Sequence, residues 1–445
     1  MQKLHDLLET TGLLSHLRNR CSEQTPCYLV GGSIRDAILG QSFEADLDFS
    51  LPGNPTAFAQ EIAASFSGSW FLLDADRQQS RVVFHSNGVR ITCDFIPFRA
   101  KDLEEDLRKR DFTINAIAWP CHLPLEVDQF IDPMGGVRDI HKQLLRICNS
   151  KTFIDDPLRT LKGVRHAATL NFDFEPVTAA LLRESVSHID QIAPERLRAE
   201  LAKTLSAENA WRGISLLQQT GLLNEIFGQP AKKEGLEQAL AGMQRFHRLL
   251  HSLDDVQHSN LLTTLDVEGE EFLSLRSLLK FTVFLQGYRP IALQNVLRAL
   301  RFSNHSIDFI LACLQLDIPA KLEEIDALPN SSRAHARWVA GLGRAPLAVL
   351  LLLLSYLPAD REVGPILDSL STAFLSYAEN DRLPDLLDGD WLRATYNLPS
   401  GPVVGRLLEL LRQAELQGEI ASAAEARLWL HDRQKTIDNI LLEHL

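Results

Sequence analysis

The stretch that decides the fold is residues 28–51, YLVGGSIRDAILGQSFEADLDFSL. An apolar run ends at the pair Gly31-Gly32 and a helical pattern begins at about Ser33, which predicts a strand, a tight turn and a helix. The later run ADLDFSL alternates polar and apolar residues and predicts another strand. Such a turn leaves backbone N–H groups free and suits a triphosphate, although a glycine pair before a helix is more often a plain turn.

Charged side chains lie close to this turn on the predicted helix. Arg35, one turn along, can donate a fork of hydrogen bonds to phosphate oxygens. Asp36 can hold the turn or bind the sugar of a nucleotide. We therefore predict that Gly31, Gly32, Arg35 and Asp36 bind a nucleotide.

Asp46 and Asp48 lie two residues apart on the second predicted strand and project from one face, while Leu47 and Phe49 point into the core. Two carboxylates this close repel each other unless a cation lies between them, and Mg²⁺ prefers oxygen ligands. The pair predicts a catalytic site for two Mg²⁺ ions that activate a hydroxyl and neutralise a leaving pyrophosphate. A D-x-D pattern alone fits a solvated edge strand better, but its position after the glycine turn and helix favours the metal site.

A third carboxylate comes from the run VRITCDFIPFR, which alternates like a strand. Asp94 can pair beside the strand of Asp46 and Asp48 and complete a catalytic acidic triad. Acids at strand ends are common, so a purely structural role is the alternative.

Length, net charge and composition limit the class of protein. A chain of 445 residues predicts two to four domains, and a net charge of −13 excludes coating of nucleic acid by the whole surface while allowing a local basic face. No run approaches the ~20 apolar residues of a membrane span. Residues 1–20 are typical of one amphipathic helix with acidic residues, which suits neither a signal nor a transit peptide, so we expect a cytoplasmic location. The six cysteines form no C-x-x-C pair and predict neither a zinc site nor a disulfide framework.

The sequence pattern changes near residue 150. Up to there, short runs typical of strands predict one sheet with a few helices: CYLVGG, ADLDFSL, SWFLLD, SRVVFHS, VRITCDFIPF, INAIAWP and DQFIDP. Beyond it, helical spacing dominates, and the run LLLLL near residue 350 is typical of a buried helix. Polar stretches at 228–235, 327–337 and 397–402 are candidate joints.

The segment DDPLRTLKGVRHA predicts a helix that carries charge on one side. Pro157 fits its first turn, with Asp155 or Asp156 as N-cap. Residues three apart then follow one side of the helix: Asp156, Arg159, Lys162 and Arg165. Spacing alone favours a capped helix with a solvated basic face.

Five segments in this order resemble the motifs of the bacterial class II tRNA nucleotidyltransferase (CCA-adding enzyme) and poly(A) polymerase family: G-G-x-x-R-D, D-x-D, EEDLRKRDFTINAIA, DDPLRTLKGVRHAATLNF and PERLRAEL. The resemblance covers roughly the first half of the chain. It implies an α+β fold, in which a polymerase-β-like nucleotidyltransferase head with a mixed sheet is followed by an all-helical neck, body and tail. The implied domains are a catalytic head at 1–150, a helical neck at 151–232, a helical body at 233–330 and an RNA-binding tail at 331–445.

The resemblance also assigns residues. Gly32 and Arg35 match positions that bind the incoming nucleotide, and Asp46 with Asp48 match the metal ligands. In RKRDFTINA, the pair near sugar and phosphates is Arg110 and Asp111, with Asn115 as a helper. The bare sequence equally fits a charged helix end before a strand.

Asp156 and Arg159 match the family's protein-based template. Cytosine and adenine both present an amino donor beside a ring-nitrogen acceptor, whereas uracil and guanine present the opposite order. A carboxylate beside a guanidinium therefore selects C and A and leaves buried polar groups unpaired with U or G. Lys162 and Arg165 complete the implied nucleotide-binding set, and Glu195 with Arg196 in PERLRAEL are implied to brace this helix.

Three departures from the family pattern stand out. Asp155 replaces a usual glutamate, and Lys162 replaces an arginine and cannot make a bidentate contact. The third is the absence of the His-Asp pair of a phosphohydrolase segment, whose slot reads Leu285-Gln286-Gly287. We interpret this region as a degenerate HD-like scaffold, with His247, His251 and His258 as surface or packing residues.

The function implied is template-independent, Mg²⁺-dependent transfer of CMP and AMP from CTP and ATP to the 3′ end of tRNA, as full CCA synthesis or only its CC or A step. A poly(A) polymerase is the alternative, and acidic stretches such as DLLDGD near the C-terminus favour tRNA. No membrane or protein partner is evident. A binding protein with a spent active site is disfavoured because Arg35, Asp46, Asp48 and Asp156 are all present.

Overall fold

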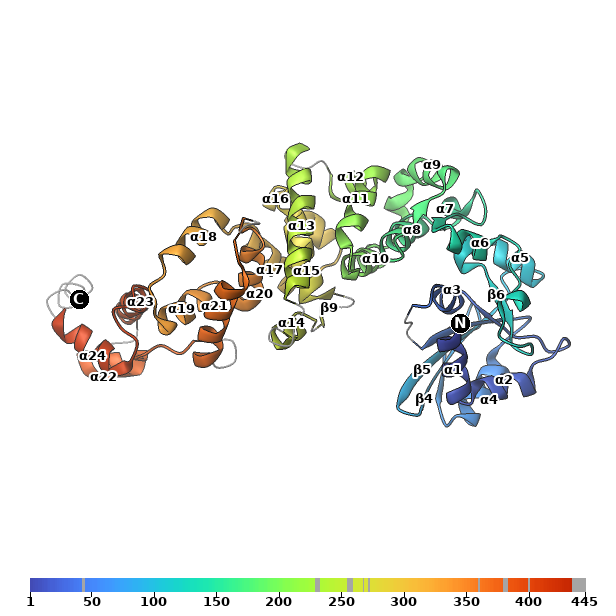
Figure 1. The fold of residues 1–445 in the computed structure, drawn as a ribbon, viewed down its shortest axis with the longest axis horizontal. Coiled ribbons are helices and arrows are strands. Elements are labelled where there is room, and N and C mark those ends of the chain that lie inside the picture. Colours follow the sequence, from blue (N-terminus) through green and yellow to red (C-terminus); the bar gives the residue numbers. More distant parts are fainter. Residues whose placement is uncertain are drawn as a thin grey trace. The chain divides into compact units, whose positions relative to one another are not determined.

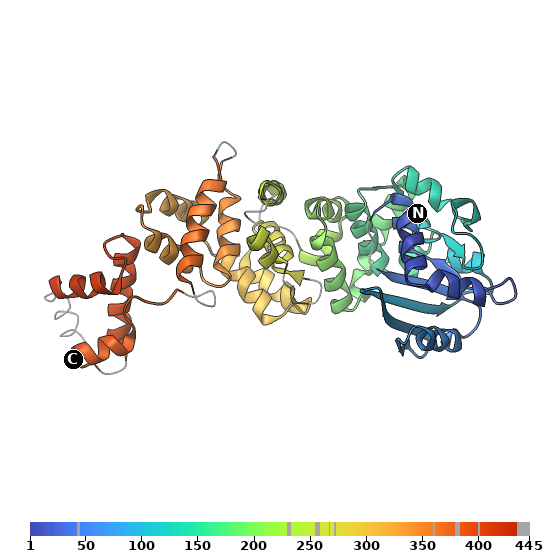
Figure 2. The ribbon, with the colours of Figure 1, turned by 60° about the horizontal axis from the view of Figure 1, so that its bottom comes forward.

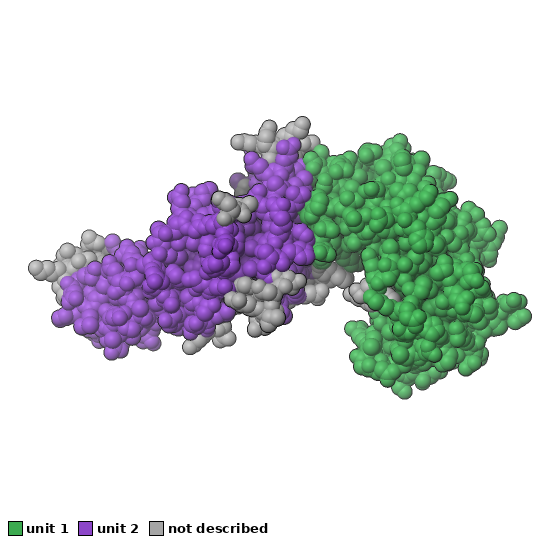
Figure 3. Space-filling view, viewed as in Figure 1, with its two compact units in different colours: residues 1–228 green, residues 229–445 purple. Residues whose placement is uncertain are grey.

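The computed structural model describes residues 1–41, 45–228, 233–253, 259–266, 268–270, 273–358, 361–378, 383–398 and 401–433. The chain divides into two compact units, residues 1–228 and 229–445 (Figure 3). The boundary falls in the predicted joint at 228–235, of which 229–232 lie outside the described residues. The division into four domains stays a prediction. Among the described helices, none has the length and apolar character that crossing a membrane requires.

The first unit is built on a sheet in the order β3-β4-β5-β2-β1-β6. Its strands are β1 (Tyr28–Val30), β2 (Asp46–Leu51), β3 (Ser69–Asp74), β4 (Gln79–Ser86), β5 (Val89–Pro97) and β6 (Ala118–Pro120). The central pair β2 and β5 is parallel and the other pairs are antiparallel, which confirms the predicted mixed sheet. The whole chain is mainly helical beyond this sheet, as the α+β fold class requires (Figures 1 and 2).

Two predicted strands are wrong in part. In INAIAWP only Ala118–Pro120 is a strand, because Thr113–Asn115 form a 3-10 turn, η1. DQFIDP is no strand of the sheet: Ile131 makes a single bridge to Ala118. The carboxylate of Asp132, immediately after it, accepts the N–H groups of Gly136 and Val137 at 2.6 and 2.9 Å, so the segment ends in a turn that begins the next helix.

One face of the sheet is the core of the unit. Side chains at most 2% exposed point into it: Leu47, Phe49, Val82, Phe84, Ile91, Cys93 and Phe95. Helices α1 (Gln2–Thr10), α2 (Leu13–Arg20) and α4 (Thr56–Ser65) lie alongside the strands (Figures 1 and 2). The single amphipathic helix predicted for residues 1–20 is in fact two helices, because Gly12 takes φ +78° between them. The opposite face of the sheet carries the polar residues of the candidate site.

The rest of the first unit is mainly helical and leads from the sheet into the neck. The parallel pair of β7 (Leu144–Leu145) with β8 (Asp173–Phe174) corrects the prediction of an all-helical neck. Its elements are α3 (Gly32–Leu39), α5 (Leu103–Arg108), η1 (Thr113–Asn115), η2 (Val127–Gln129), α6 (Gly136–His141), β7 (Leu144–Leu145), α7 (Thr152–Asp155), α8 (Leu158–Thr169), β8 (Asp173–Phe174), α9 (Pro176–Glu184), η3 (Val186–Gln191), α10 (Pro194–Ser206), α11 (Ala210–Thr220) and α12 (Leu222–Phe227). Helices α10 and α11 pack on α8. Gly163 of α8 lets Phe112 and Phe174 approach, since a Cβ there would lie only 3.0 and 3.2 Å from their rings.

The second unit consists of α13 (Lys233–Ser252), α14 (Ser259–Leu265), β9 (Glu268–Glu270), β10 (Leu273–Ser274), α15 (Leu275–Leu285), α16 (Pro290–Ala299), α17 (Asn304–Leu314), α18 (Ile318–Ala327), α19 (Ser332–Ala340), α20 (Pro346–Leu354), α21 (Gly364–Tyr377), α22 (Gly389–Tyr396), α23 (Pro402–Leu416) and α24 (Ala423–Asp432). The pair β9 and β10 corrects the prediction of an all-helical body. The apolar helix α20 is buried, as predicted. His247 and His251 lie edge to face on α13 with ring centroids 4.5 Å apart, and His258 lies outside the described residues.

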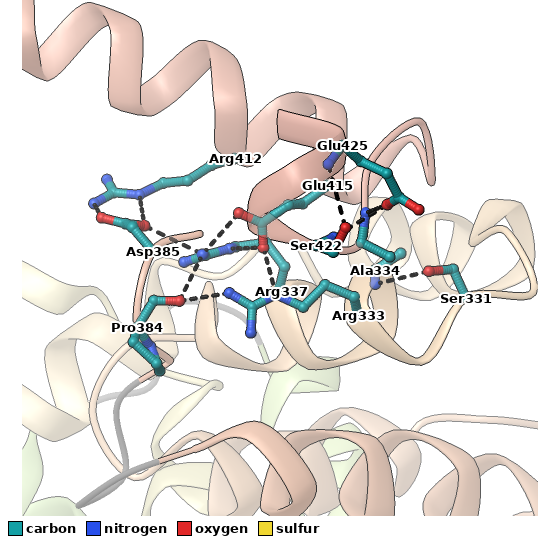
Figure 4. A network of polar contacts seen from close by, with 11 residues as sticks. Ser331, Arg333, Ala334, Arg337, Pro384, Asp385, Arg412, Glu415, Ser422 and Glu425 are labelled. Carbon is teal, nitrogen blue, oxygen red and sulfur yellow. Dashed lines mark hydrogen bonds and ion pairs between the residues drawn. The ribbon is translucent and has the colours of Figure 1, made fainter. Parts of the chain in front are cut away.

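A buried ionic network ties α19 to α23 in this unit (Figure 4). The carboxylate of Glu415 is fully buried and accepts from Arg333 at 2.8 Å and from Arg337 at 3.0 and 3.1 Å. Both arginines also donate to the backbone carbonyl of Pro384, and Arg337 reaches Asp385 at 3.1 Å. Every member has a partner of opposite charge or an acceptor, which a buried cluster of charges requires.

Candidate active site

The diglycine turn faces both an acidic and a basic side chain. β1 ends at Val30, Gly31 takes φ +87° and α3 begins at Gly32. A Cβ added to Gly31 would lie 3.5 Å from Oδ2 of Asp48 and 3.7 Å from Nη1 of Arg110. The backbone therefore needs glycine here for its conformation, and the space beside it lies between a carboxylate and a guanidinium.

The predicted carboxylates come together on two parallel strands. Asp48 of β2 is the register partner of Asp94 of β5, and Asp46 lies two residues before Asp48, so the three side chains share one face of the sheet. Burial raises the pKa of Asp48 to about 6; Arg110 opposes this rise, and Asp94 and Asp46 add to it. The carboxylates of Asp46 and Asp48 offer oxygen donors of the kind that a hard divalent cation such as Mg²⁺ prefers.

Asp94 is engaged by a residue that the sequence analysis missed. Arg81 of β4 is its cross-strand partner and donates from Nε and Nη2 to its two carboxylate oxygens at 2.6 and 2.7 Å. Asp94 thus adds negative charge beside Asp48 while both of its oxygens accept from the protein. Its role as a third metal ligand stays a prediction.

Arg35 and Asp36 are bonded to each other and to the next motif. The guanidinium of Arg35 donates to both oxygens of Asp36 at 2.8 and 3.0 Å and to Oδ1 of Asn115 at 2.7 Å. Asn115 in turn donates to Asp111 at 3.1 Å. Burial alone would raise the pKa of Asp111, but Lys162, Asn115 and the N–H of Phe112 together lower it, so Asp111 is an anion. The predicted residues of two motifs therefore form one hydrogen-bonded network behind the turn, and Lys162 of a third motif acts on it through its charge.

Arginine side chains concentrate positive charge in front of this network. Nε of Arg110 and Nη1 of Arg159 are buried and have no hydrogen-bond partner among the described residues. Burial and the neighbouring Arg110 lower the pKa of Arg99. Buried donors without acceptors are unfavourable by themselves, and an anionic ligand such as a triphosphate would satisfy them.

The predicted charged residues at and along α8 make different contacts. The predicted N-cap is wrong, because Pro157 is the N-cap of α8 and Asp156 follows the end of α7. Oδ1 of Asp156 accepts from the N–H of Leu158 at 3.2 Å, and Oδ2 lies 3.5 Å from Nη2 of Arg196. Arg196 thus contacts the helix that it is implied to brace. Arg165 does not join the others: its guanidinium donates to Glu200 of α10 at 2.8 Å, outside the cleft described next.

These residues line a cleft of about 1180 Å³. From the predicted set it holds Gly31, Gly32, Arg35, Asp48, Arg110, Asp111, Asn115, Asp156, Arg159 and Lys162, but not Asp36, Asp46, Asp94 or Arg165. The lining residues outside the predicted set are Asp74, Arg77, Gln79, Ile96, Pro97, Phe98, Arg99, Asp155, His166 and Arg196. Asp74, Arg77 and Gln79 lie at the turn between β3 and β4. In the sequence, this turn is marked only by the polar run DADRQQ between two predicted strands.

His166 is a buried imidazole in the cleft wall. Its Nε2 lies 3.5 Å from the Asn115 amide nitrogen and 3.4 Å from Nη2 of Arg165, both of which are donors. Burial, followed by the nearby Arg165, lowers the pKa of His166 well below its usual value. The ring is therefore neutral near pH 7 and presents an acceptor to these two groups.

Comparison with known proteins decides the family. The sequence profile of the Poly A polymerase head domain matches residues 27–146, and that of the "Probable RNA and SrmB- binding site of polymerase A" matches residues 171–234. An A-adding tRNA nucleotidyltransferase of Deinococcus radiodurans is 31% identical over 90% of this chain and 94% of its own length. The chain belongs to the tRNA nucleotidyltransferase and poly(A) polymerase family. A CC-adding tRNA nucleotidyltransferase of Geobacter sulfurreducens is 29% identical over 92% of each chain.

Solved structures of this family share the fold. A CCA-adding enzyme in complex with CTP has a TM-score of 0.71 at 24% identity, covering 97% of this chain and 98% of its own. The Thermotoga maritima CCA-adding enzyme complexed with tRNA-CCA has a TM-score of 0.67 at 23% identity, covering 98% and 95%. The predicted fold class and family resemblance are thereby confirmed. The protein is an RNA nucleotidyltransferase of a family that generally uses divalent metal ions, and Asp46 and Asp48 stay the predicted ligands of such an ion.

Proposed function

We propose that this nucleotidyltransferase adds CMP, AMP or both, from CTP and ATP, to the 3′ end of tRNA without a nucleic-acid template. The observation that carries the proposal is one cleft that joins Gly31, Asp48 and Arg110 to Asp156 and Arg159. The named relatives act on tRNA in CC-adding, A-adding and CCA-adding forms, so a poly(A) polymerase is not favoured. A cytoplasmic location belongs to the same proposal.

The chain's own residues supply binding and orientation for this reaction. The N–H of Gly31 donates to the carbonyl of Ile117 at 3.4 Å, so the N–H of Gly32, with Arg110 and Lys162, would bind the triphosphate. The network behind the turn holds Arg35 and Asp111 in place. The terminal 3′-oxygen of the RNA forms a bond to the α-phosphorus, the bond from that phosphorus to the β-phosphate oxygen breaks, and pyrophosphate leaves. Asp46 and Asp48 would hold two Mg²⁺ ions, which supply stabilisation of the attacking and leaving oxygens when bound.

Nucleotide choice would come from the start of α8. The carboxylate of Asp156 accepts from the amino group of cytosine or adenine, and the guanidinium of Arg159 donates to the ring nitrogen beside it. The free Nη1 of Arg159 and its position in the cleft wall support this role. Contact with Arg196 at 3.5 Å and the hydrogen bond from the N–H of Leu158 would keep Asp156 in one orientation.

An incorporation assay tests the proposal. Purified protein with Mg²⁺ is given each labelled nucleotide singly, with tRNAs that end before CCA, after CC or with the complete CCA, and with an unrelated RNA. Addition of CMP, of AMP or of both that stops at CCA supports the proposal and identifies the step. Unlimited addition of AMP to every RNA would establish poly(A) synthesis instead.

We expect Asp156→Asn to lower kcat/KM for CTP and ATP by about 10- to 100-fold and to reduce discrimination against UTP. The change replaces one acceptor oxygen by a donor, so a pyrimidine or purine amino group loses its partner, while the remaining oxygen of asparagine can still accept from the N–H of Leu158. The measurement is kcat/KM for each of the four nucleotides. Asp190→Asn, the same change at an exposed position of η3, is the control, and equal profiles for the two variants would contradict the assignment.

Gly31→Ala tests the diglycine turn. We expect the KM for CTP or ATP to rise at least about tenfold, because a methyl group would enter the space between Asp48 and Arg110. The positive φ of Gly31 also predicts a loss of about 1 kcal/mol in the free energy of unfolding. Gly40→Ala is the matched control, since Gly40 has φ +70° with nothing within 4 Å, so it should lose stability without a change in KM. A similar rise in KM for both variants would assign the effect to backbone strain.

A further inference from the structure

A row of register partners crosses the open face of the sheet from the candidate metal site to its edge. Asp48 of β2 pairs with Asp94 of β5, Asp94 with Arg81 of β4, and Arg81 with Phe71 of β3. Partners in register point to the same face, so the row runs from carboxylates through a guanidinium to an aromatic ring. β3 is the outer strand of the sheet.

The outer half of this row is accessible. Phe71 is 43% exposed and the side chain of Arg81 is 37% exposed. Arg81 uses Nε and Nη2 for Asp94, and its Nη1 takes no part in these two bonds. Toward the far end of the same face, Arg90 of β5 adds positive charge, and it is exposed together with its register partner His85 of β4. Alternate residues of β4 and β5 point into the buried core instead.

We propose that Phe71 and Arg81 form the subsite for the 3′-terminal nucleotides of the RNA that is being extended. This inference rests on the proposed function and names a part of that site which lies outside the nucleotide cleft. The attacking 3′-hydroxyl must approach the α-phosphorus from the side opposite to the leaving pyrophosphate. With the triphosphate at the diglycine turn and Arg110, that approach would come from the side of β4 and β3, whose Asp74 and Gln79 also line the cleft. The row of Asp94, Arg81 and Phe71 begins at the carboxylates and leads away across the sheet.

The chemistry of the row fits single-stranded RNA. An exposed aromatic ring stacks on any unpaired base, and an arginine with free N–H groups binds a backbone phosphate. Arg81 would then hold Asp94 with one edge of its guanidinium and the RNA backbone with the other. The terminal phosphodiester and the catalytic carboxylates are thereby kept at a fixed separation, which makes Arg81 a positioning residue.

The test measures RNA affinity without catalysis. Two RNA hairpins are compared by fluorescence anisotropy on the full chain, one with unpaired nucleotides at its 3′ end and one with a blunt end. We expect Phe71→Ala to raise the Kd of the hairpin with the unpaired end about fivefold or more and to leave the blunt hairpin unchanged. Leu72→Ala is the matched control, because Leu72 is the next residue of β3, is also 43% exposed and points to the opposite face.

Arg81→Gln is tested by the salt dependence of the same binding. Loss of one phosphate contact to a single strand should reduce the slope of log Kd against log salt by about 0.7, whereas Phe71→Ala should leave the slope unchanged. The control is Arg18→Gln, an exposed arginine of α2 on the other side of the sheet. Phe71→Trp should restore affinity, because it keeps a stacking ring.

The outcomes separate this inference from the proposed function. If Phe71→Ala and Leu72→Ala change both hairpins equally, the subsite is absent, whatever the wild-type protein incorporates. If the wild-type protein transfers neither CMP nor AMP to tRNA, the proposed function fails, while a selective loss of binding would still establish an RNA-binding row. Normal thermal unfolding of Phe71→Ala shows that a loss of affinity does not arise from misfolding.

Discussion

Asp48→Asn is expected to lower nucleotide transfer by at least about 10³-fold and to stabilise the protein in the same step. Asp48 lies beside Asp46 and Asp94 and next to the diglycine turn, so its carboxylate would carry much of the metal binding. Metal ions contribute several kcal/mol of transition-state stabilisation, and asparagine keeps only one neutral oxygen for them. The rate is measured as incorporation of CMP and AMP at saturating Mg²⁺.

The stability effect follows from the pKa of Asp48, about 6 in the folded chain against 3.8 for an ordinary aspartate. Below pH 3.8 the carboxyl is protonated in both states and contributes no penalty. As the pH rises toward 6, the unfolded state releases its proton first and gains stability relative to the folded state. Above pH 6 the folded state carries the full penalty, on the order of 3 kcal/mol. Asp48→Asn removes this penalty, so its gain in stability should be largest above pH 6 and should vanish toward pH 4.

Thermal or chemical unfolding of the wild type and of Asp48→Asn at several pH values, with and without Mg²⁺, measures this difference in stability. Mg²⁺ should stabilise the wild-type protein and not the variant, because ligands stabilise the state that binds them. Asp128→Asn, the same change at an exposed position of η2, should alter neither transfer nor the pH dependence of stability. A variant that is less stable than the wild type at pH 7.5, or that still responds to Mg²⁺, would contradict the placement of Asp48 in a crowded acidic site.

The local elements of the head could be predicted because their signals are short in range. Alternation with a period of two residues placed Asp46 and Asp48 on one face of β2, and the glycine pair placed a turn before α3. The break at Gly12 was missed, since one glycine inside an amphipathic pattern does not by itself end a helix. DQFIDP was mistaken for a strand because it is a short run with an aromatic and a β-branched residue, Phe130 and Ile131, while the hydrogen bonds that Asp132 accepts from the start of the next helix are not visible as a sequence pattern.

Only those residues of the candidate site that belong to sequence motifs could be predicted. Arg81 and Phe71 were not predicted, because their positions depend on the register of β4 and β3, and no local sequence pattern shows that register. Arg165 has the same spacing as Arg159 and Lys162, yet the packing of α10 turns it toward Glu200. A step of three residues falls about 60° short of a full turn of an α-helix, so over the six residues from Arg159 to Arg165 the side chains drift by about 120° around the helix, which is enough to take Arg165 out of the cleft.

In the second unit, Glu415→Gln is expected to reduce the free energy of unfolding by about 3–5 kcal/mol. Glu415 is fully buried, and the arginines that it binds, Arg333 and Arg337, are only 5 and 9% exposed. Glutamine keeps the shape of the side chain but removes its charge, so two guanidinium groups lose their buried counter-ion (Figure 4). Arg337 retains Asp385 at 3.1 Å, which makes Arg333 the group left most poorly compensated.

The measurement is chemical unfolding followed by a probe in the second unit, together with CTP affinity as a readout for the first unit, where the cleft lies. We expect CTP affinity to stay unchanged. Glu409→Gln is the matched control on α23, because Glu409 is 59% exposed and lies 3.7 Å from Arg412, so its removal should change stability by less than about 0.5 kcal/mol. Combining Glu415→Met with Arg333→Met should recover part of the loss, since an apolar pair of similar size needs no counter-ion. Equal stabilities for Glu415→Gln and Glu409→Gln would mean that the buried charges do not hold α19 and α23 together.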